Sequence, residues 1–584
     1  MWKQVKNFLN DPLGGSNKSK PASPKRSASP KPASPKRSVL LKAKPKPKEF
    51  RTPEKILSKS KSKYAKISLK PEQVPQVNSI IEILKNNICA FDMSMMGAGK
   101  TYVSAEIAVK FGFKKVIVVC PASVVGKWKM IKSTYGVPIQ YVMSYEMLRS
   151  TKDHQPYHGL LTRFDEIINE KSRSMTFKSY GNNDVNIPVL ETRHQVRFEA
   201  TDKLKTLVTE GCLFIFDEAQ KIKNKNAQWY AAKTIAETLI EISGKSRFLL
   251  LSGTPIDKEE HALNIMNMMG FIRSRKLYTT DDGRIILIGA KELILFCEKV
   301  NKKATEETLA EYPIRAKEDV NKLCYHLFQN VIKKYMTSSI KVEENQKVKV
   351  DVKNGYYNMD SETDKVKLRN AIDTINRTLR KRIYRKADGN VYNNPIQKLG
   401  GVVKQLMLIE ALKVPIFVRL AKQRLQENPN AKVALFVNYT SNLDALMKDL
   451  SVYNPIKFNG SVSKDIRQEL INKYQEDNND YRLFIGNIGA SATGIDLDDK
   501  YGNRPRYIFA SPNFNILDLH QLVYRFKRND TKSDSVFRYV YVKNNTEVNI
   551  LNNLARKSNV MKETLTGQVE GGIKFPGEYE NEIE

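Results

Sequence analysis

The sequence predicts an α/β protein with two parallel-sheet domains in tandem, and three observations lead to this fold class. Its 584 residues are too many for a single hydrophobic core. From about residue 67, short runs of Val, Ile, Leu and Phe alternate with longer amphipathic stretches, as expected for parallel strands covered by helices on both faces. These runs form an early and a late group, separated by a long stretch of mainly helical pattern.

The strand-like runs locate the two sheets and divide the chain. The expected strands are 115–120, 212–216 and 247–251 in the first domain and 432–437, 481–485, 506–510 and 537–542 in the second. The predicted organisation is a disordered basic arm at 1–66, a first sheet domain at 67–260, a helical insertion at 261–430, a second sheet domain at 431–565 and an acidic flexible tail at 566–584.

The net charge of +34, from 97 Lys and Arg against 63 Asp and Glu, indicates an anionic partner. Nucleic acid is the first candidate and a membrane surface is the rival. No apolar run is long enough to span a bilayer, and the N-terminus lacks the apolar core of a secretory signal. Five scattered cysteines fit reduced core residues. These features favour an intracellular protein without a membrane partner.

The arm at 1–66 holds 19 Lys and Arg against three Asp and Glu, which accounts for +16 of the total charge and leaves +18 for the remaining residues. It is rich in Ser, Pro and Lys, and it repeats one heptapeptide at 21–27 and 32–38. Such a segment cannot bury apolar surface and is expected to be disordered. Nonspecific contact with nucleic acid is favoured over a merely solubilising arm, and a nuclear targeting signal is the third alternative.

A phosphate-binding loop is predicted at 94–101, because this Gly-rich segment follows an apolar run at 88–91 and precedes a helical pattern at 102–111. Backbone amides near the glycines and the positive end of a helix suit phosphate oxygens, and a lysine suits the β- and γ-phosphates of ATP. The alternative is a Gly-rich turn that opens an ordinary helix. The residues expected to bind the nucleotide are Met96, Gly97, Ala98, Gly99, Lys100 and Thr101.

Two carboxylates, Asp217 and Glu218, follow the apolar run at 213–216. At the end of a buried strand they would face a crevice, where Asp217 and the hydroxyl of Thr101 would hold Mg²⁺. Glu218 would orient and deprotonate the attacking water. An Asp-Glu pair is also common in solvated loops, so the assignment depends on the phosphate-binding loop upstream.

With Ser252-Gly253-Thr254-Pro255, the ordered segments resemble superfamily 2 helicases, and in detail their Swi/Snf-type branch. Further segments of the first half resemble motifs of that branch in order, at 69–73, 121–128, 144–148 and 221–224. The resemblance implies that Gln73 reads the adenine and that the other segments grip a nucleic-acid strand or relay the nucleotide state. Gln220 stands where the family usually has His.

The second half resembles the same branch at 459–467, at 490–497 and at 521–528. The last of these fits the Gln-x-x-x-Arg-x-x-Arg pattern. By this resemblance Arg525 and Arg528 reach across a cleft to the γ-phosphate, and Arg528 is the favoured arginine finger. Asp496 stands where the family usually has Asn.

The resemblance implies two RecA-like domains and an ATP-driven translocase or helicase that uses ATP and Mg²⁺, acts on DNA in preference to RNA, and has double-stranded DNA as the leading substrate. An RNA helicase is the rival enzyme, and a DNA-condensing or virion structural protein with a relic ATPase fold is the alternative of another class. Helicases and nucleoside triphosphate phosphohydrolases of large DNA viruses are the nearest comparison. They imply transcription or genome handling, RNA polymerase or other transcription proteins as partners, and a nuclear, virion or cytoplasmic replication-site location.

Direct contacts to nucleic acid are predicted from charge and aromatic residues. A basic helical stretch within the insertion puts positions 377, 381 and 385 on one face, which suits a phosphate backbone as well as it suits solvent. The residues proposed to touch nucleic acid are Arg377, Arg380, Lys381 and Arg385. The aromatic residues Trp128, Tyr141 and Tyr145 suit either base stacking or the hydrophobic core.

Overall fold

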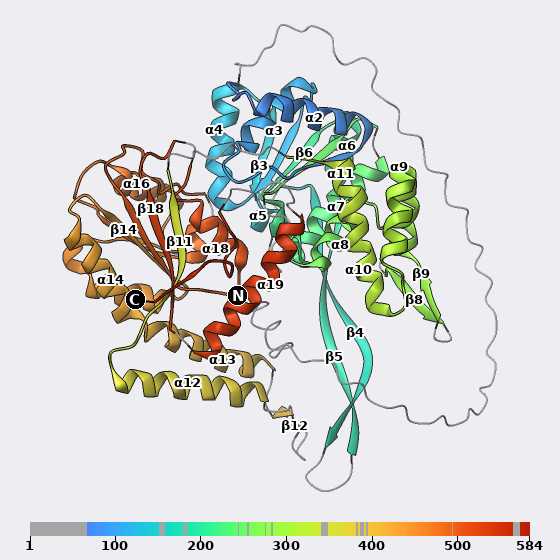
Figure 1. The fold of residues 1–584 in the computed structure, drawn as a ribbon. Helices are drawn as coiled ribbons and strands as arrows, with labels where there is room; N and C mark the ends of the chain where they lie inside the picture. The colour runs from blue at the N-terminus through green and yellow to red at the C-terminus, as the bar shows by residue number, and fades with distance from the viewer. Residues whose placement is uncertain are drawn as a thin grey trace, which may run out of the picture.

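The structure is a computed structural model. It describes residues 67–583 apart from short gaps at 151–157, 179–183, 243, 254–255, 275, 282–283, 340–347, 381–383, 386–390, 393–394, 493, 529, 543 and 565–572. The predicted basic arm at 1–66 lies outside the described residues. Two α/β lobes stand side by side, each built on a parallel sheet (Figure 1), and the predicted fold class is confirmed.

Lobe 1 comprises residues 67–338 and contains a six-stranded sheet with the order β10-β1-β7-β6-β2-β3, in which neighbouring strands are parallel. Its four central strands are entirely buried, which explains their continuous apolar runs. The strands are β1 (Cys89–Asp92), β2 (Val116–Cys120), β3 (Ile139–Ser144), β6 (Leu213–Asp217), β7 (Arg247–Leu251) and β10 (Thr337–Ser338).

Helices cover both faces of this sheet because successive side chains of each strand point to opposite sides. Residues such as Val118 pack with α2 (Gln73–Asn86), α3 (Lys100–Lys110) and α4 (Val125–Tyr135) in one core. Residues such as Val119 pack into a second, larger core. The helices on that side are α5 (Tyr145–Arg149), α6 (Asp202–Glu210), α7 (Ala227–Ile242) and α8 (Glu259–Met268).

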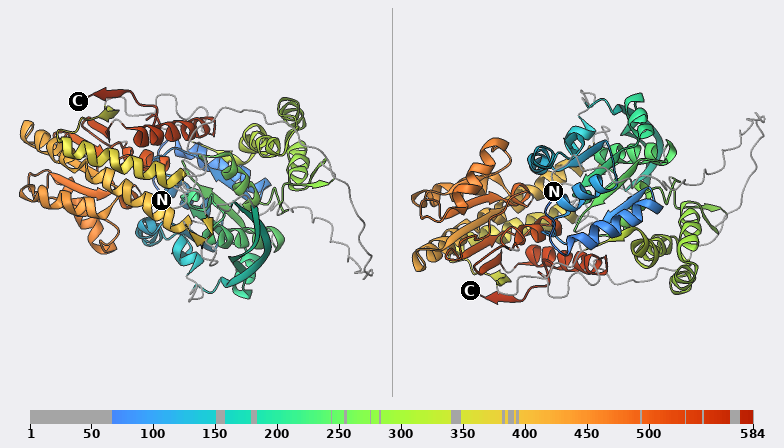
Figure 2. Two further views of the ribbon diagram at one scale, coloured as in Figure 1. Left: turned by 90° about the horizontal axis from the view of Figure 1, so that it is seen from below. Right: turned by 90° about the horizontal axis from the view of Figure 1, so that it is seen from above.

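Two additions project from lobe 1. The antiparallel hairpin of β4 (Leu161–Lys178) and β5 (Asp184–Ala200) extends away from the sheet (Figure 1). A helical unit lies on the side of lobe 1 away from the lobe 2 sheet (Figure 2). It contains β8 (Tyr278–Asp281), β9 (Arg284–Leu287), α9 (Gly289–Glu311), α10 (Lys317–Leu327), the π-helical turn η3 (Phe328–Ile332) and α11 (Lys333–Met336).

Lobe 2, residues 348–583, has a seven-stranded parallel sheet with the order β15-β16-β14-β17-β18-β11-β19. The strands are β11 (Val350–Tyr356), β14 (Lys432–Val437), β15 (Ile456–Phe458), β16 (Leu483–Asn487), β17 (Arg506–Ala510), β18 (Ser535–Tyr541) and β19 (Asn581–Ile583). The helices are α12 (Glu362–Arg380), α13 (Pro395–Ala411), α14 (Val414–Glu427), α15 (Thr440–Asp449), α16 (Lys464–Gln475), α17 (Ile488–Ser491), α18 (Ile516–Val523) and α19 (Asn545–Thr564).

The structure corrects two parts of the predicted organisation. The region 261–430, expected to be a helical insertion, supplies β10 to the lobe 1 sheet and β11 to the lobe 2 sheet. The region 566–584, expected to be a flexible tail, has Ile573 and Phe575 buried and ends in β19, which pairs with β11. The physical reason is that its aromatic and aliphatic side chains bury apolar surface, which its acidic composition conceals.

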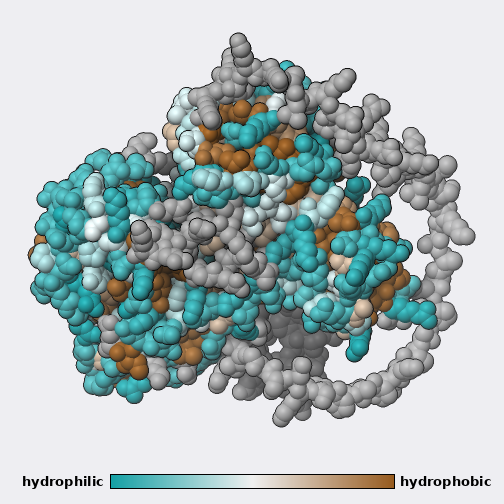
Figure 3. All heavy atoms as spheres, turned by 45° about the horizontal axis from the view of Figure 1, so that its top comes forward, coloured by the Kyte–Doolittle hydropathy of each residue, from teal (hydrophilic) through white to brown (hydrophobic). Residues whose placement is uncertain are grey.

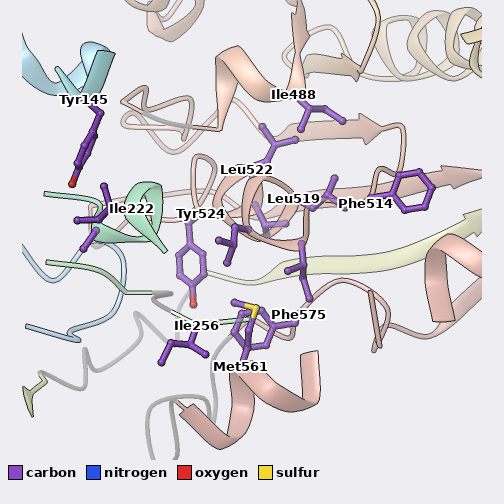
Figure 4. Packing of buried hydrophobic residues seen from close by; sticks show 14 of the residues in the cluster. Tyr145, Ile222, Ile256, Ile488, Phe514, Leu519, Leu522, Tyr524, Met561 and Phe575 are labelled. Atoms are coloured by element: carbon purple, nitrogen blue, oxygen red, sulfur yellow. The ribbon is translucent and has the colours of Figure 1, made fainter. Parts of the chain in front are cut away.

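The lobes share one hydrophobic cluster. It includes Tyr145, Ile222 and Ile256 of lobe 1 together with Tyr524 and Met561 of lobe 2, which Figure 4 shows from close by. The helix α19 also connects the lobes, since Glu563 near its end accepts a hydrogen bond from the Tyr325 hydroxyl on α10 at 2.9 Å. On the face in Figure 3, hydrophobic residues form separate patches among hydrophilic ones.

Among the described residues, no helix combines the length and apolarity needed to cross a membrane. All five cysteines are buried and none forms a disulfide, as the sequence predicts. Burial raises the pKa of the Cys297 thiol to about 12 and that of Cys212 to about 11, so both are uncharged core side chains at neutral pH.

Candidate active site

The predicted phosphate-binding loop connects the end of β1 to the start of α3. Gly97 and Gly99 have φ angles of +85° and +81°, a region that residues with a Cβ rarely adopt. The Lys100 ammonium donates to the carbonyl oxygens of Ser94 at 2.9 Å and Met95 at 3.0 Å. The strand, loop and helix therefore hold Lys100 and the buried Thr101 at the N-terminal end of α3.

Gln73 and Gly253 lie against this loop from outside it. The amide of Gln73 donates to the Ala98 carbonyl at 2.8 Å, and its oxygen accepts from the Lys70 backbone N–H at 2.9 Å. The backbone at Gly253 also approaches the loop closely, since a Cβ added there would stand 3.0 Å from the Ser94 carbonyl oxygen. The expected adenine-reading residue Gln73 thus supports the loop here, because both ends of its amide have partners within the protein.

Asp92 under the loop is a residue that sequence reasoning missed. Its Oδ1 accepts hydrogen bonds from the Ser94 backbone N–H and from the Gln76 amide, each at 2.9 Å. The Gln76 oxygen in turn accepts from the Ser338 hydroxyl at 2.7 Å, which connects the loop to β10. Burial raises the pKa of Asp92 above its ordinary value. An Asp in an apolar strand carries no signal of this role in the sequence.

Asp217 and Glu218 lie at the end of β6, as predicted. The Asp217 carboxylate accepts a hydrogen bond from the Trp128 indole at 2.9 Å, and its backbone carbonyl accepts one from the Tyr145 hydroxyl at 2.9 Å. Burial and the neighbouring charge of Glu218 raise the pKa of Asp217 to about 6, although the Trp128 bond opposes the shift. Glu218 has a left-handed φ of +55°, which points to a constrained turn.

Glu218 faces residues of both lobes. It accepts a hydrogen bond from the amide of Gln220, the residue that replaces the family's usual His. The Gln220 oxygen accepts from the Ser252 hydroxyl at 2.6 Å, so two of the predicted segments are joined in one chain of contacts. Gln521 of lobe 2 lies 3.4 Å from the same carboxylate, a long contact across the cleft.

The two predicted cleft arginines have different surroundings. Arg528 donates from Nε and Nη2 to the Asp496 carboxylate at 2.7 and 2.5 Å, and its Nη1 lies 3.8 Å from the position of a Cβ built on Gly97. Arg525 is buried and donates to the Ala492 and Ile495 carbonyls at 3.0 and 3.1 Å. Its guanidinium is therefore committed to a loop of its own lobe.

Lys127 is a second residue that sequence reasoning missed. Its ammonium lies 5.3 Å from the centre of the Tyr102 ring. Tyr102 belongs to α3, the helix that follows the phosphate-binding loop. Partial removal from solvent lowers the pKa of Lys127, and the carboxylates of Asp217 and Asp496 oppose the shift. The helix α4 thus places the Trp128 indole against Asp217. Its preceding residue, Lys127, adds a positive charge to the cleft.

The donor set at this cleft fits a nucleoside triphosphate with a divalent cation. The loop bends through two positive-φ glycines, and at Gly99 the Gln73 amide also leaves no room for a Cβ. A loop with this backbone geometry can approach phosphate closely. The oxygen ligands that suit Mg²⁺ are the buried hydroxyl of Thr101 and the carboxylate of Asp217.

The predicted strand-gripping segments also meet between the lobes, around a cavity of about 160 Å³ lined by Pro121, Ala122, Ser123, Tyr145, Glu146 and Lys221 of lobe 1 and Arg467, Gly489 and Ala490 of lobe 2. We call this cavity the interlobe groove. A Cβ added to Gly494 would stand 2.6 Å from the Ser123 Cβ, so the lobes approach closely beside it.

Not every expected nucleic-acid residue faces this groove. Lys223 is buried in an ion pair with Asp257, which also contacts the His261 ring at 2.6 Å, so it joins two segments of lobe 1. The basic stretch of the insertion is not one helix face, because α12 ends at Arg380 and Arg385 belongs to the strand β12 (Tyr384–Arg385), which pairs with β13 (Val391–Tyr392). Arg377 is exposed on α12, and Lys381 lies outside the described residues.

Comparisons with known proteins find matches to both lobes. The SNF2-related domain matches residues 37–362 and the helicase conserved C-terminal domain matches residues 413–530. A protein of Acanthamoeba polyphaga mimivirus, named as a candidate ATP-dependent RNA helicase, is 25% identical over 528 residues, which cover 88% of this chain and 87% of that protein. The Sulfolobus solfataricus SWI2/SNF2 ATPase core in complex with double-stranded DNA is 14% identical, with a TM-score of 0.29, over 86% of this chain and 94% of that one.

Two parallel-sheet lobes with these ordered segments define an ATP-hydrolysing helicase of superfamily 2 that binds nucleic acid. Because the SNF2-related domain covers more than half of its length, the chain belongs to the SNF2-related family.

Proposed function

We propose that this protein is a nucleic-acid-stimulated ATPase that moves along double-stranded DNA. The observation that carries the proposal is the meeting of both lobes at two adjacent places, the interlobe groove and the cleft between the phosphate-binding loop and Arg528. A change in the distance between the lobes alters both places together. Nucleotide state and grip on a strand are therefore coupled, provided that the strand binds the open and closed states with different affinity.

At the nucleotide, we assign phosphate binding to the backbone of residues 96–99 and to Lys100. Lys100 donates to loop carbonyls in this structure, and it must exchange those bonds for the β- and γ-phosphates when ATP binds. We assign Mg²⁺ binding to Thr101 and Asp217. When bound, the ion would neutralise charge on the phosphates. Gln73 would read adenine only after giving up one of its two present partners.

For hydrolysis, we assign the general base to Glu218. Its carboxylate is oriented by the amides of Gln220 and Gln521, so it can accept a proton from a water held near the γ-phosphate. Arg528 is the proposed finger, since Nη1 lies toward Gly97 while Asp496 holds the rest of the guanidinium. Such a cation stabilises charge that develops in the transition state. Arg525 is reassigned to holding the loop at 492–495 in place.

The experiment that tests this proposal measures ATP turnover against duplex DNA, single-stranded DNA and RNA. We expect the largest stimulation with duplex DNA. Displacement of a triplex-forming strand without unwinding of a fork would then identify a translocase, and fork unwinding would identify a helicase. Stimulation by RNA and not by DNA would refute the proposed substrate.

An RNA helicase is the second candidate, and the observation in its favour is the name of the mimivirus relative. The same relative supports a viral setting, for which we propose a role in transcription or genome handling at a nuclear, virion or cytoplasmic replication site, with polymerase or other transcription proteins as partners. A structural protein with a relic ATPase fold is the alternative of another class, and it requires that Lys100→Ala leave ATP turnover unchanged.

A further inference from the structure

Two aromatic residues from different segments of lobe 1 hold Asp217 from both sides. The Trp128 indole N–H donates to the side-chain Oδ2, and the Tyr145 hydroxyl donates to the backbone carbonyl. Both aromatic side chains are buried, with 0% and 1% of their surface exposed. Base stacking, which the sequence allows for both, is therefore excluded in this conformation, because a stacked base needs an exposed ring face.

Each aromatic residue belongs to a segment that borders the interlobe groove. Tyr145 lines the groove itself, beside Glu146, while its hydroxyl points away to Asp217. Trp128 lies on α4, which begins directly after the short 3₁₀ turn η1 (Ala122–Val124) at the groove. A strand that displaces either segment would thus move a hydrogen-bond donor to Asp217.

These hydrogen bonds can control the carboxylate because it is buried and has few other partners. Asp217 is 5% exposed, so a bond to its charged oxygen is worth more than one in water. The bond from Trp128 engages Oδ2 and leaves Oδ1 available to a cation. The rotation of the carboxylate, and with it the direction of the free oxygen, is set by the indole.

We propose that Trp128 and Tyr145 are positioning residues that couple occupation of the interlobe groove to Asp217. A strand in the groove would shift the two donors and thereby align the free Asp217 oxygen for the nucleotide-bound cation, which accounts for stimulation of ATP turnover without any contact between strand and nucleotide. The inference deepens the proposed function and rests on it.

The test uses the full chain with Trp128→Phe and Tyr145→Phe, each of which removes a donor and keeps an aromatic ring. Trp229→Phe is the matched control for the first, because the Trp229 indole is 2% exposed and donates to the Asn264 carbonyl at 3.1 Å. Tyr539→Phe is the control for the second, since its buried hydroxyl lies 3.3 Å from the Leu519 carbonyl. Thermal unfolding of all four variants checks their folding.

Two measured ratios show whether Trp128 and Tyr145 position Asp217 or only support the fold. The first is the ratio of ADP affinities with and without Mg²⁺, measured by calorimetric titration, which we expect Trp128→Phe to reduce about tenfold, the effect of losing a hydrogen bond to a charged group. The second is the ratio of duplex-stimulated to basal ATP turnover, which we expect Tyr145→Phe to reduce by a factor of about three or more, with DNA affinity retained. The controls should keep both ratios.

A further measurement needs no substitution in the site. With 5-fluorotryptophan in place of the three tryptophans, the ¹⁹F resonance of Trp128 should shift when duplex DNA is added, whereas that of Trp229, identified with the control variant, should not. The inference is overturned if the Trp128 resonance stays in place or if both ratios keep their wild-type values in Trp128→Phe and Tyr145→Phe. A loss of DNA affinity in Tyr145→Phe that matches the loss of stimulation would make Tyr145 a gripping residue instead.

Failure of the proposed function gives a different result. If wild-type turnover does not respond to any nucleic acid, the proposed function fails, while the Mg²⁺ ratio still tests the link from Trp128 to Asp217. If wild-type turnover responds and both variants respond equally, the proposed function stands and the inference fails.

Discussion

Replacing Arg528 and Arg525 one at a time should distinguish a residue needed for ATP turnover from a residue needed for stability. Arg528 pairs with Asp496 through side chains that are 16% and 55% exposed, and because the carboxylate is open to solvent the pair stabilises the fold by about 1 kcal/mol or less. As the proposed finger it should contribute about 10³-fold or more to turnover, which corresponds to about 4 kcal/mol. Arg528→Ala should therefore lose turnover with little change in unfolding.

The opposite result is expected for Arg525→Ala. Arg525 is 7% exposed, and its removal leaves the buried carbonyls of Ala492 and Ile495 without a donor. At about 1 to 3 kcal/mol for each of these two unsatisfied groups, we expect a loss of about 2 to 6 kcal/mol in unfolding free energy.

Chemical denaturation gives the stability of both variants, and single-turnover ATP hydrolysis at saturating nucleotide gives the rate of the chemical step. Asp496→Asn is the matched variant for the tether, because it keeps an acceptor for Arg528 and removes only the charge. A rate for Arg528→Ala within about tenfold of wild type would refute the assignment of the finger. If Arg525→Ala lost turnover while its unfolding stayed unchanged, the two roles would have to be exchanged.

Three further predictions concern other parts of the molecule. Lys100→Ala and Glu218→Gln should each abolish most ATP turnover, with nucleotide affinity reduced only in the first; unchanged turnover in either would place the active site elsewhere. Burial lowers the pKa of Lys432 to about 7, so between about pH 7 and 10 the unfolded chain binds more protons than the folded one, and the free energy of unfolding should rise with pH across that window. In Lys432→Met this dependence on pH should be weaker. Equal dependence on pH in wild type and variant, measured by denaturation at several pH values, would contradict this. Deleting 1–66, which carries +16, should weaken DNA binding and reduce its salt dependence while basal ATP turnover persists. If DNA affinity depended on salt equally with and without the arm, or if turnover were lost, the charge of the arm would act elsewhere.

Local patterns predicted the parts of the fold that are locally encoded. The buried central strands are continuous apolar runs, so the starts of β7, β14 and β17 fall where the sequence places them. The strands β10 and β11 were missed because their few residues are mixed in polarity and become strands only by pairing with β1 and β18. The end of the basic helix at Arg380 was missed for a related reason, since the charge pattern continues past the end of α12.

The candidate site also contains residues that the sequence predicts and residues that only the structure reveals. The motif residues were predicted because their spacing is visible along the chain. Asp92 and Lys127 instead depend on neighbours that are distant in sequence, such as Ser338 for the Gln76 bridge and Asp496 for the cleft. The same holds at two positions where this sequence departs from the family's usual residue. Gln220 accepts a hydrogen bond from Ser252, and Asp496 accepts one from Arg528.

By itself, the sequence determined the two-lobed α/β class, the order of the ATPase segments and the division of charge between arm and body, because strand periodicity, glycine positions and composition are properties of local chain chemistry. Only the tertiary structure decided which arginine faces the phosphate-binding loop, that Trp128 and Tyr145 hold Asp217, and that the acidic end pairs as β19. These outcomes depend on burial and hydrogen-bond partners brought together across long sequence separations, and a linear pattern does not contain them.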